Sequence, residues 1–261
     1  MSRLVAHLAE AETPWLKNLL IRQAIKRFDI DTSEAVHESL ADYSSFNDFF
    51  TRALKPSARP IAPDADVVVS PADGIISQCG DITEGRFFQT KGHTYPLTTL
   101  VGDEGLACRF HSGTFVTVYL SPRDYHRVHM PVSARLVEAR YIPGQLFSVN
   151  RATVAGVTNL FACNERLVCT FETQRGAVCV ILVGALLVAG IETVWHGHYA
   201  PKQPTIEHFD KPLLYDKGAE IGRFKFGSTV IVLLPEHYTL ETTVAEEASV
   251  KVGESLAKEH F

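Results

Sequence analysis

The chain has 261 residues, of which 46% are hydrophobic and 21% charged. This is the composition of an ordinary globular protein with a sizeable core, and it excludes wholesale disorder. The formal net charge of −5 provides no overall positive field, so we expect no nucleic-acid partner. The five cysteines form no C-x-x-C pair. This indicates reduced thiols in a reducing compartment and predicts no metal site.

Apolar residues recur at helical spacing from residue 1 to about residue 54. The stretch Trp15–Phe28 contains Lys17, Arg22, Lys26 and Arg27 and no acidic residue, and its large apolar side chains gather on the opposite side of a helix. Two interpretations are open. The helix lies in the interface of an anionic membrane, or it packs on its own domain with a solvated basic face.

Polar residues with capping ability precede two further stretches of this region. Ser45 is placed to cap a helix formed by FNDFF, and Asp31 or Thr32 to cap a helix that begins near Ser33. We therefore expect short helices to follow the basic one.

The segment Leu54–Pro63 contains three prolines, which favour an extended connector and mark a domain boundary. We predict a helical region with its linker at 1–63 and a β-rich domain at 64–261. The second part consists of short β-type runs separated by turn residues, without long helices between them. The fold class predicted is α+β, with N-terminal helices followed by a mostly antiparallel sandwich or barrel-like domain.

The longest apolar run, Ala177 to Ile191, is shorter than the roughly 18 to 20 residues that a membrane-spanning helix needs. Its glycines and β-branched residues predict two core strands joined near Gly184.

The run GRFKFGSTVIVLLP places Gly227, Ser228 and Thr229 at the entrance of a predicted buried strand. Taken alone, these residues are most simply a glycine bulge followed by small strand residues. A serine after glycine can also attack the preceding carbonyl, because Gly227 lacks a Cβ and tolerates the strained backbone that this attack requires. The amide would then become an ester. Ser228 does not lie in the G-x-S-x-G pattern of the α/β-hydrolases.

Two other stretches carry titratable residues after predicted strands. Asp73 lies in SPADG, which is by itself ordinary turn chemistry. His126 and His129 lie in YHRVHMP beside arginines that would repel a metal cation, which leaves a structural role or acid–base work. With Ser228, these residues supply the parts of a nucleophilic triad.

Six stretches together resemble the phosphatidylserine decarboxylase family in its bacterial-type form, which makes phosphatidylethanolamine. They lie between about residues 46 and 234 and read FNDFFTRALKPSARPI, SPADG with the following IISQCG, YHRVHMP, NERLVCTFET, LVGALLVAGIETVW and GRFKFGSTVIVLL. The family usually has leucine where this chain has Phe226. This is an exchange of one apolar residue for another before the cleavage site.

The resemblance implies that Ser228 attacks the carbonyl of Gly227, assisted by His129 and oriented by Asp73. The ester would be eliminated by loss of the serine α-proton, and hydrolysis would leave a pyruvoyl group and ammonia. The products would be fragments 1–227 and 228–261. Thr229 is adjacent and could hydrogen-bond the oxyanion. Slower self-cleavage of Thr229→Val would support this hypothesis, and unchanged cleavage would contradict it.

The pyruvoyl group formed from Ser228 would be the covalent cofactor. In the family it condenses with the amine of phosphatidylserine and accepts electrons as CO2 leaves. The resemblance makes His126 the candidate to protonate the resulting carbanion. His196 and His198 are candidate wall residues, for which a structural role is equally open.

A phospholipid substrate favours the membrane interpretation of the basic helix. We therefore expect a peripheral protein on the cytoplasmic face of the cell membrane, with an anionic lipid surface as a partner. The sequence is compatible with a homo-oligomer but does not specify one. Two alternatives stay open: a pyruvoyl-dependent decarboxylase of another amine, and an unprocessed, noncatalytic lipid-binding relative.

Overall fold

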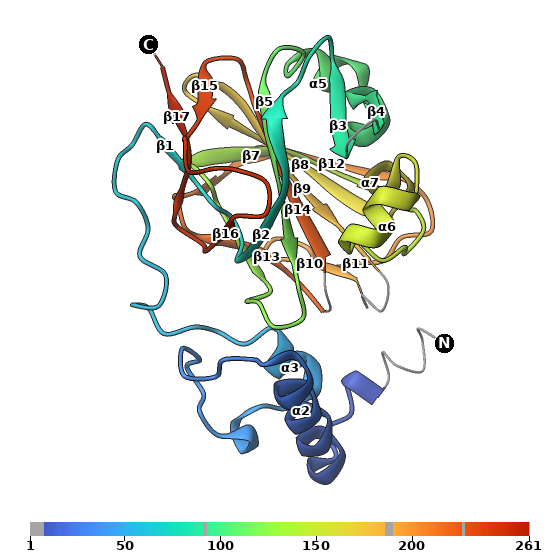
Figure 1. Ribbon diagram of the computed structural model, residues 1–261, viewed down its shortest axis with the longest axis vertical. Helices are drawn as coiled ribbons and strands as arrows, with labels where there is room; N and C mark the ends of the chain where they lie inside the picture. The colour runs from blue at the N-terminus through green and yellow to red at the C-terminus, as the bar shows by residue number, and fades with distance from the viewer. Residues whose placement is uncertain (1–7, 91–92, 186–189, 226–227, 261) are drawn as a thin grey trace.

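The computed structural model describes residues 8–90, 93–185, 190–225 and 228–260 (Figure 1). Its first part is helical, with α2 (Pro14–Phe28), the 3-10 turn η1 (Leu40–Asp42) and α3 (Phe46–Phe50). The predicted cap of α3 is confirmed, because the Ser45 side chain accepts a hydrogen bond from the Asp48 amide at 3.1 Å. The helix predicted near Ser33 is wrong. The Asp31 carboxylate accepts from the Ser33 amide at 2.8 Å and closes a local turn there.

One antiparallel sheet of eight strands forms the centre of the fold. In spatial order the strands are β12 (Thr205–Tyr215), β7 (Ala134–Ile142), β8 (Arg166–Thr173), β9 (Gly176–Val183), β14 (Ser228–Leu234), β5 (Thr114–Leu120), β2 (Gly74–Asp81) and β16 (Ser249–Val250). Strand β14 therefore lies in the interior of the sheet, between β9 and β5.

Smaller sheets and short helices cover this central sheet. One sheet has the order β11 (Gly197–Tyr199), β10 (Ile191–Thr193), β13 (Glu220–Phe224) and β6 (Arg127–His129), and another has the order β1 (Val67–Val69), β17 (Ser255–Glu259) and β15 (Tyr238–Leu240). A hairpin of β3 (Arg86–Thr90) and β4 (His93–Pro96) is accompanied by α4 (Leu97–Val101), α5 (Glu104–Cys108), α6 (Arg151–Gly156) and α7 (Leu160–Cys163).

The core lies on both faces of the central sheet, and β14 contributes to both. Val230 and Val232 pack in the cluster that includes Ile191 and Phe224 of the four-stranded sheet. Ile231 packs on the opposite face, in a cluster with side chains of the β3 hairpin and the short helices. Side chains on a strand alternate between faces, so a strand buried on both faces is apolar at nearly every position. Burial on both faces explains the uninterrupted run VIVLL. The N-terminal helices followed by antiparallel sheets confirm the predicted α+β class.

The apolar run that begins at Ala177 forms β9, which confirms its first predicted strand. Its last residue, Ile191, begins β10, which belongs to a different sheet, and the second predicted strand stays a prediction. Residues 186–189 of this run lie outside the described part of the chain.

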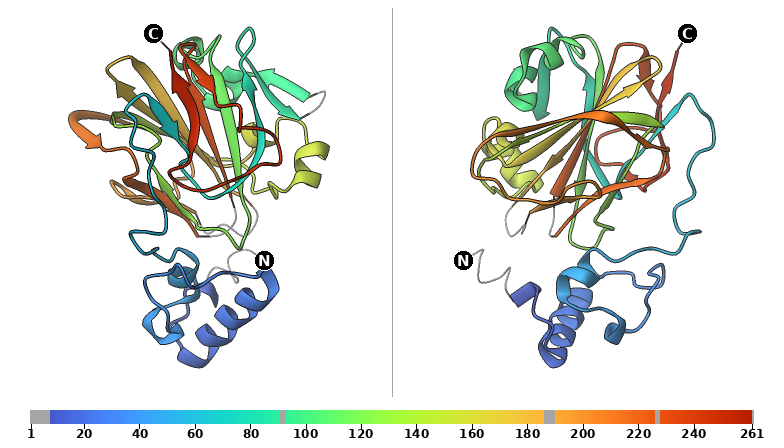
Figure 2. Two further views of the ribbon diagram at one scale, coloured as in Figure 1. Left: turned by 60° about the vertical axis from the view of Figure 1, so that its left-hand side comes forward. Right: turned by 180° about the vertical axis from the view of Figure 1, so that it is seen from behind.

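The helical part lies at one end of the β-rich part, and the connector runs along its side toward β1 (Figures 1 and 2). The connector is anchored at both ends. The Lys55 amide donates to the Glu34 carbonyl at 2.8 Å, and the Ala62 amide donates to the Gly253 carbonyl at 3.0 Å. The boundary between domains at residue 63 stays a prediction.

Candidate active site

Ser228 is the first residue of β14 and pairs with Leu120 of β5. Its side chain is fully buried, and its Oγ has no hydrogen-bond partner among the described residues. A buried hydroxyl normally has a partner, so an unpartnered one is a candidate for chemistry. Gly227, the other half of the predicted cleavage site, lies outside the described residues.

His126 lies in the turn between β5 and β6 and is fully buried. Its Nδ1 is 2.8 Å from the carbonyl oxygen of Asp124, which can only accept, so Nδ1 carries the proton. Nε2 therefore holds a lone pair, and it has no partner among the described residues. Burial, which penalises the charged ring, lowers the pKa of His126 to about 3. His126 is thus a neutral base with one free nitrogen.

His129, the last residue of β6, has both ring nitrogens engaged. Nδ1 donates to the Gly218 carbonyl at 2.8 Å, and Nε2 accepts from the Tyr125 hydroxyl at 3.0 Å. The Tyr125 and His129 rings also stack, with their centroids 5.6 Å apart. Burial lowers the pKa of His129, so this imidazole too is neutral near pH 7.

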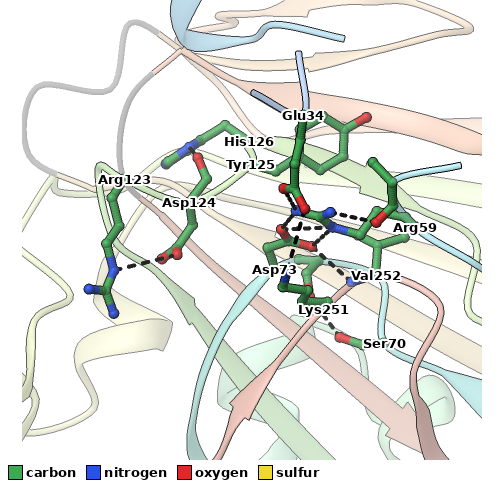
Figure 3. Close-up of polar contacts among 12 residues, drawn as sticks. Glu34, Arg59, Ser70, Asp73, Arg123, Asp124, Tyr125, His126, Lys251 and Val252 are labelled. Atoms are coloured by element: carbon green, nitrogen blue, oxygen red, sulfur yellow. Dashed lines mark hydrogen bonds and ion pairs between the residues drawn. The ribbon is translucent and has the colours of Figure 1, made fainter. Parts of the chain in front are cut away.

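Asp73 follows β1 in a turn and is buried (Figure 3). Its Oδ1 accepts from Arg59 Nε and from the Val252 amide, each at 2.9 Å. Arg59 also donates to Glu34 at 2.8 Å, and Lys251 Nζ lies 3.5 Å from the same carboxylate. Asp73 therefore belongs to a charged network that joins the helical region, the connector and the β-rich part.

The predicted site residues meet at one end of the β-rich part, but not as a hydrogen-bonded triad. The His129 amide donates to the Pro71 carbonyl at 2.8 Å, which places the Asp73 turn beside β6. Among the described residues, no hydrogen bond joins Asp73 to His129 or either histidine to Ser228. The roles assigned to these residues stay predictions.

Sequence reasoning missed Arg59 as the partner of Asp73. Arg59 lies within the proline-rich connector, whose composition predicts only an extended linker. The sequence contains one signal for this contact, namely a cation within a segment that its prolines keep extended.

His196 contacts Glu207 and Tyr199, and His198 lies nearby in sequence. His196 Nδ1 lies 3.0 Å from Glu207, and its ring stacks on Tyr199 with the centroids 4.0 Å apart. Burial lowers the pKa of His198 in β11. These contacts are compatible with the structural role that the sequence left open.

The residues at the entrance of β14 fit a carbonyl group derived from Ser228. Ser228 Oγ and His126 Nε2 are buried and have no partner among the described residues. Thr229 Oγ1 also lacks a partner among them, but Thr229 faces the opposite side of the sheet from Ser228, with Ile231 rather than with Val230. Polar atoms buried without partners in the protein are suited to a reacting group that supplies the complementary atoms.

Comparison with known proteins gives a consistent result. A family profile described as phosphatidylserine decarboxylase matches residues 46–258, and a second profile, PSD, matches residues 1–29. A relative named phosphatidylserine decarboxylase proenzyme, from Alcanivorax borkumensis, is 54% identical over 242 residues, which are 90% of this chain and 83% of the relative. Proteins of the same name from Pseudomonas aeruginosa (strain LESB58) and Bordetella avium are each 49% identical, over 98% of this chain and 92% and 90% of the relatives.

With the family profile matching more than half of its length and with relatives of this similarity, the chain belongs to the phosphatidylserine decarboxylase family.

Proposed function

We propose that this protein decarboxylates phosphatidylserine to phosphatidylethanolamine and CO2, using a pyruvoyl group that Ser228 forms by self-cleavage at Gly227–Ser228. The observation that carries the proposal is the fully buried Ser228, whose Oγ has no partner among the described residues, at the entrance of a central strand. Membership of a family whose relatives are named proenzymes supports it, because a proenzyme is processed before it acts.

Self-cleavage begins when a base takes the proton of Ser228 Oγ, and Oγ then bonds to the Gly227 carbonyl carbon. The C–N bond breaks, and the amine takes up a proton, which completes the ester. Loss of the serine α-proton releases Gly227 as a carboxylate, and water converts the remaining dehydroalanine to a ketone and ammonia. His129 is the proposed base. It can accept a proton at Nε2 only after Tyr125 releases its hydrogen bond to that atom.

In the mature enzyme the pyruvoyl carbonyl would supply an acceptor for the electrons that remain when CO2 leaves. His126 is the proposed proton donor at the carbon that loses the carboxylate. Its free Nε2 must first take up a proton. Because burial lowers the pKa of His126 to about 3, the protonated ring is a strong acid and returns that proton readily.

Intact mass spectrometry and product analysis test this function together. We expect protein purified from its host to consist of fragments 1–227 and 228–261, the second with a ketone in place of its terminal amine, and to release CO2 from phosphatidylserine. Ser228→Ala should stay uncut and inactive. An active but unbroken chain would overturn self-cleavage. Turnover of another amine substrate without turnover of phosphatidylserine would overturn the substrate assignment.

We also propose that α2 contacts an anionic membrane on the cytoplasmic face. Trp15 is 70% and Leu19 48% exposed. They share a helix face with the exposed Arg22 and Lys26, so the prediction that the large apolar side chains lie opposite the cations is wrong for these two residues. Lys17 does not contribute to this face, because it is buried and donates to the carbonyls of Leu40 and Tyr43. No helix within the described residues is long and apolar enough to cross a bilayer.

Exposed cations add only about 1 kcal/mol each near an anionic leaflet, so the apolar side chains must contribute most of the binding. We expect Trp15→Ser with Leu19→Ser to reduce binding to phosphatidylglycerol-containing vesicles and to leave self-cleavage intact. Val36→Ser, at a position 46% exposed outside α2, is the control. Equal vesicle binding by the double variant and the control would exclude α2 as the contact.

A further inference from the structure

Arg52, two residues after α3, is a buried cation with an incomplete set of partners. Its exposed fraction is 4%, and its Nη2 donates to the Arg123 carbonyl at 3.3 Å. Nε and Nη1 have no hydrogen-bond partner among the described residues, and no described carboxylate lies within ion-pair distance. The guanidinium lies 5.6 Å from the centre of the Phe49 ring, which offers only partial compensation for lost hydration.

Arg166 shows how this fold buries a guanidinium for purely structural reasons. It too is 4% exposed and lacks a carboxylate partner among the described residues. Its Nε, Nη1 and Nη2 all donate to backbone carbonyls, namely those of Leu100, Ala162, Asn164 and Thr99, at 2.6 to 3.1 Å. Arg52 has only one such carbonyl partner among the described residues. Burying an unpaired charge is costly, so its donors are expected to meet an anion that the protein does not itself supply.

Arg52 is positioned next to the proposed proton donor. Arg52 and His126 bond to the carbonyls of two consecutive residues, Arg123 and Asp124. The Phe50 ring lies 4.1 Å from the His126 ring, between centroids, so the end of α3 packs directly on this turn. An anion that completes the partners of Arg52 would therefore lie near the His126 ring.

We propose that Arg52 binds the phosphodiester of the substrate headgroup. This inference rests on the proposed function. The substrate headgroup contains two anions, a serine carboxylate and a phosphodiester. Only one of them loses its charge during decarboxylation. The carboxylate leaves as neutral CO2, so a guanidinium bound to it would stabilise the ground state against the transition state. The phosphodiester keeps its charge throughout, and Arg52 can hold it without opposing the reaction.

The kinetic test uses dihexanoyl phosphatidylserine below its critical micelle concentration, so that membrane binding does not enter. Loss of a contact made equally in the ground and transition states raises KM and leaves kcat unchanged. We expect Arg52→Met to cleave itself and to show a KM raised about 10- to 100-fold, as for loss of a charged hydrogen bond, and Arg52→Lys to recover part of it. An unchanged KM in cleaved Arg52→Met overturns the proposal. Wild-type turnover in the same assay tests the proposed function separately.

A binding test covers a variant that fails to cleave. In the uncut Ser228→Ala chain, we expect glycerophosphoethanolamine, which has a phosphodiester and no carboxylate, to bind, and Arg52→Met to abolish its binding. Binding of glycerophosphoserine alone, lost in Arg52→Met, would assign Arg52 to the carboxylate and contradict the proposal. Binding of glycerophosphoethanolamine that survives Arg52→Met would contradict it as well.

Thermal stability separates a ligand role from a structural one. Because Arg52 is buried without full partners, Arg52→Met in the Ser228→Ala chain should keep or raise the melting temperature. Arg166→Met removes hydrogen bonds to four backbone carbonyls and should lower the melting temperature. A fall for Arg52→Met as large as for Arg166→Met would show that Arg52 is a structural residue and overturn the proposal.

Discussion

The two histidines of YHRVHMP differ in chemistry because their Nε2 atoms have different surroundings. Both donate from Nδ1 to a backbone carbonyl, which fixes the same tautomer in each ring. Nε2 of His126 has no partner in the described part of the chain, whereas Nε2 of His129 accepts from Tyr125. The residue types and their spacing predicted two candidate bases. Which of them is free depends on Tyr125, Gly218 and Asp124, and the sequence alone does not reveal these contacts.

The buried His126 should make the protein less stable in mild acid. Its pKa falls from 6.5 to about 3 on folding, so the unfolded chain binds more protons between these values. The contribution of the neutral His126 ring to the free energy of unfolding is therefore complete above about pH 6.5. It is lost as the pH falls toward 3, and the loss is about 1 kcal/mol at pH 5.5. His129, whose pKa is also lowered, acts in the same direction.

Urea denaturation of the uncut Ser228→Ala chain at pH 7.5 and 5.5 measures this effect. Adding His126→Gln should lower stability at both pH values but reduce the difference between them by about 1 kcal/mol. A pH dependence that is the same with and without His126→Gln would contradict the burial of a neutral ring.

At the scale of elements, the connector is a structural part of the site. Arg59 lies between Asp73 and Glu34, and the side chains of Arg59 and Asp73 are 10% and 8% exposed. Removing one partner of a buried ion pair leaves the other charge without compensation. We expect Arg59→Gln to cost about 3 kcal/mol of unfolding free energy in the Ser228→Ala chain and to slow self-cleavage in the Ser228 chain, because Asp73 loses its orientation.

The same connector offers a matched control. Lys55 and Glu38 form an ion pair at 2.8 Å whose side chains are 43% and 73% exposed. Lys55→Gln should cost much less stability than Arg59→Gln and leave cleavage unchanged, because water already screens this pair. Urea denaturation measures both variants. Equal losses of stability in Arg59→Gln and Lys55→Gln would show that the buried network stabilises the fold no more than an exposed ion pair does.

Local patterns predicted the elements better than the partners of individual side chains. The apolar run of β14, the Ser45 cap and the basic helix α2 each depend on residues adjacent in sequence, and the structure confirms all three elements. Lys17 was counted among the solvated cations, but it is buried against carbonyls of η1 and the residue after it. Such contacts depend on how distant segments pack, and hydrophobic periodicity does not encode that packing.

At the scale of the whole molecule, the proposed cut falls where the chain enters the centre of its main sheet. The fragment 228–261 contains β14, which pairs with β5 along all seven of its residues and with β9 along five. The same fragment contributes β16, paired with β2, and β17, paired with β1. Cleavage of one peptide bond removes none of these contacts.

We therefore expect the two fragments to stay together after cleavage. Native mass spectrometry of the processed protein should give one species with the summed mass of both fragments, and they should separate only in denaturant. Once separated, fragment 1–227 would lack the strand between β5 and β9 and expose both apolar faces that β14 covers, so it should aggregate. Spontaneous release of fragment 228–261 under native conditions would contradict the central position of β14. Retention of this strand matters for function, because it carries the residue that becomes the proposed cofactor.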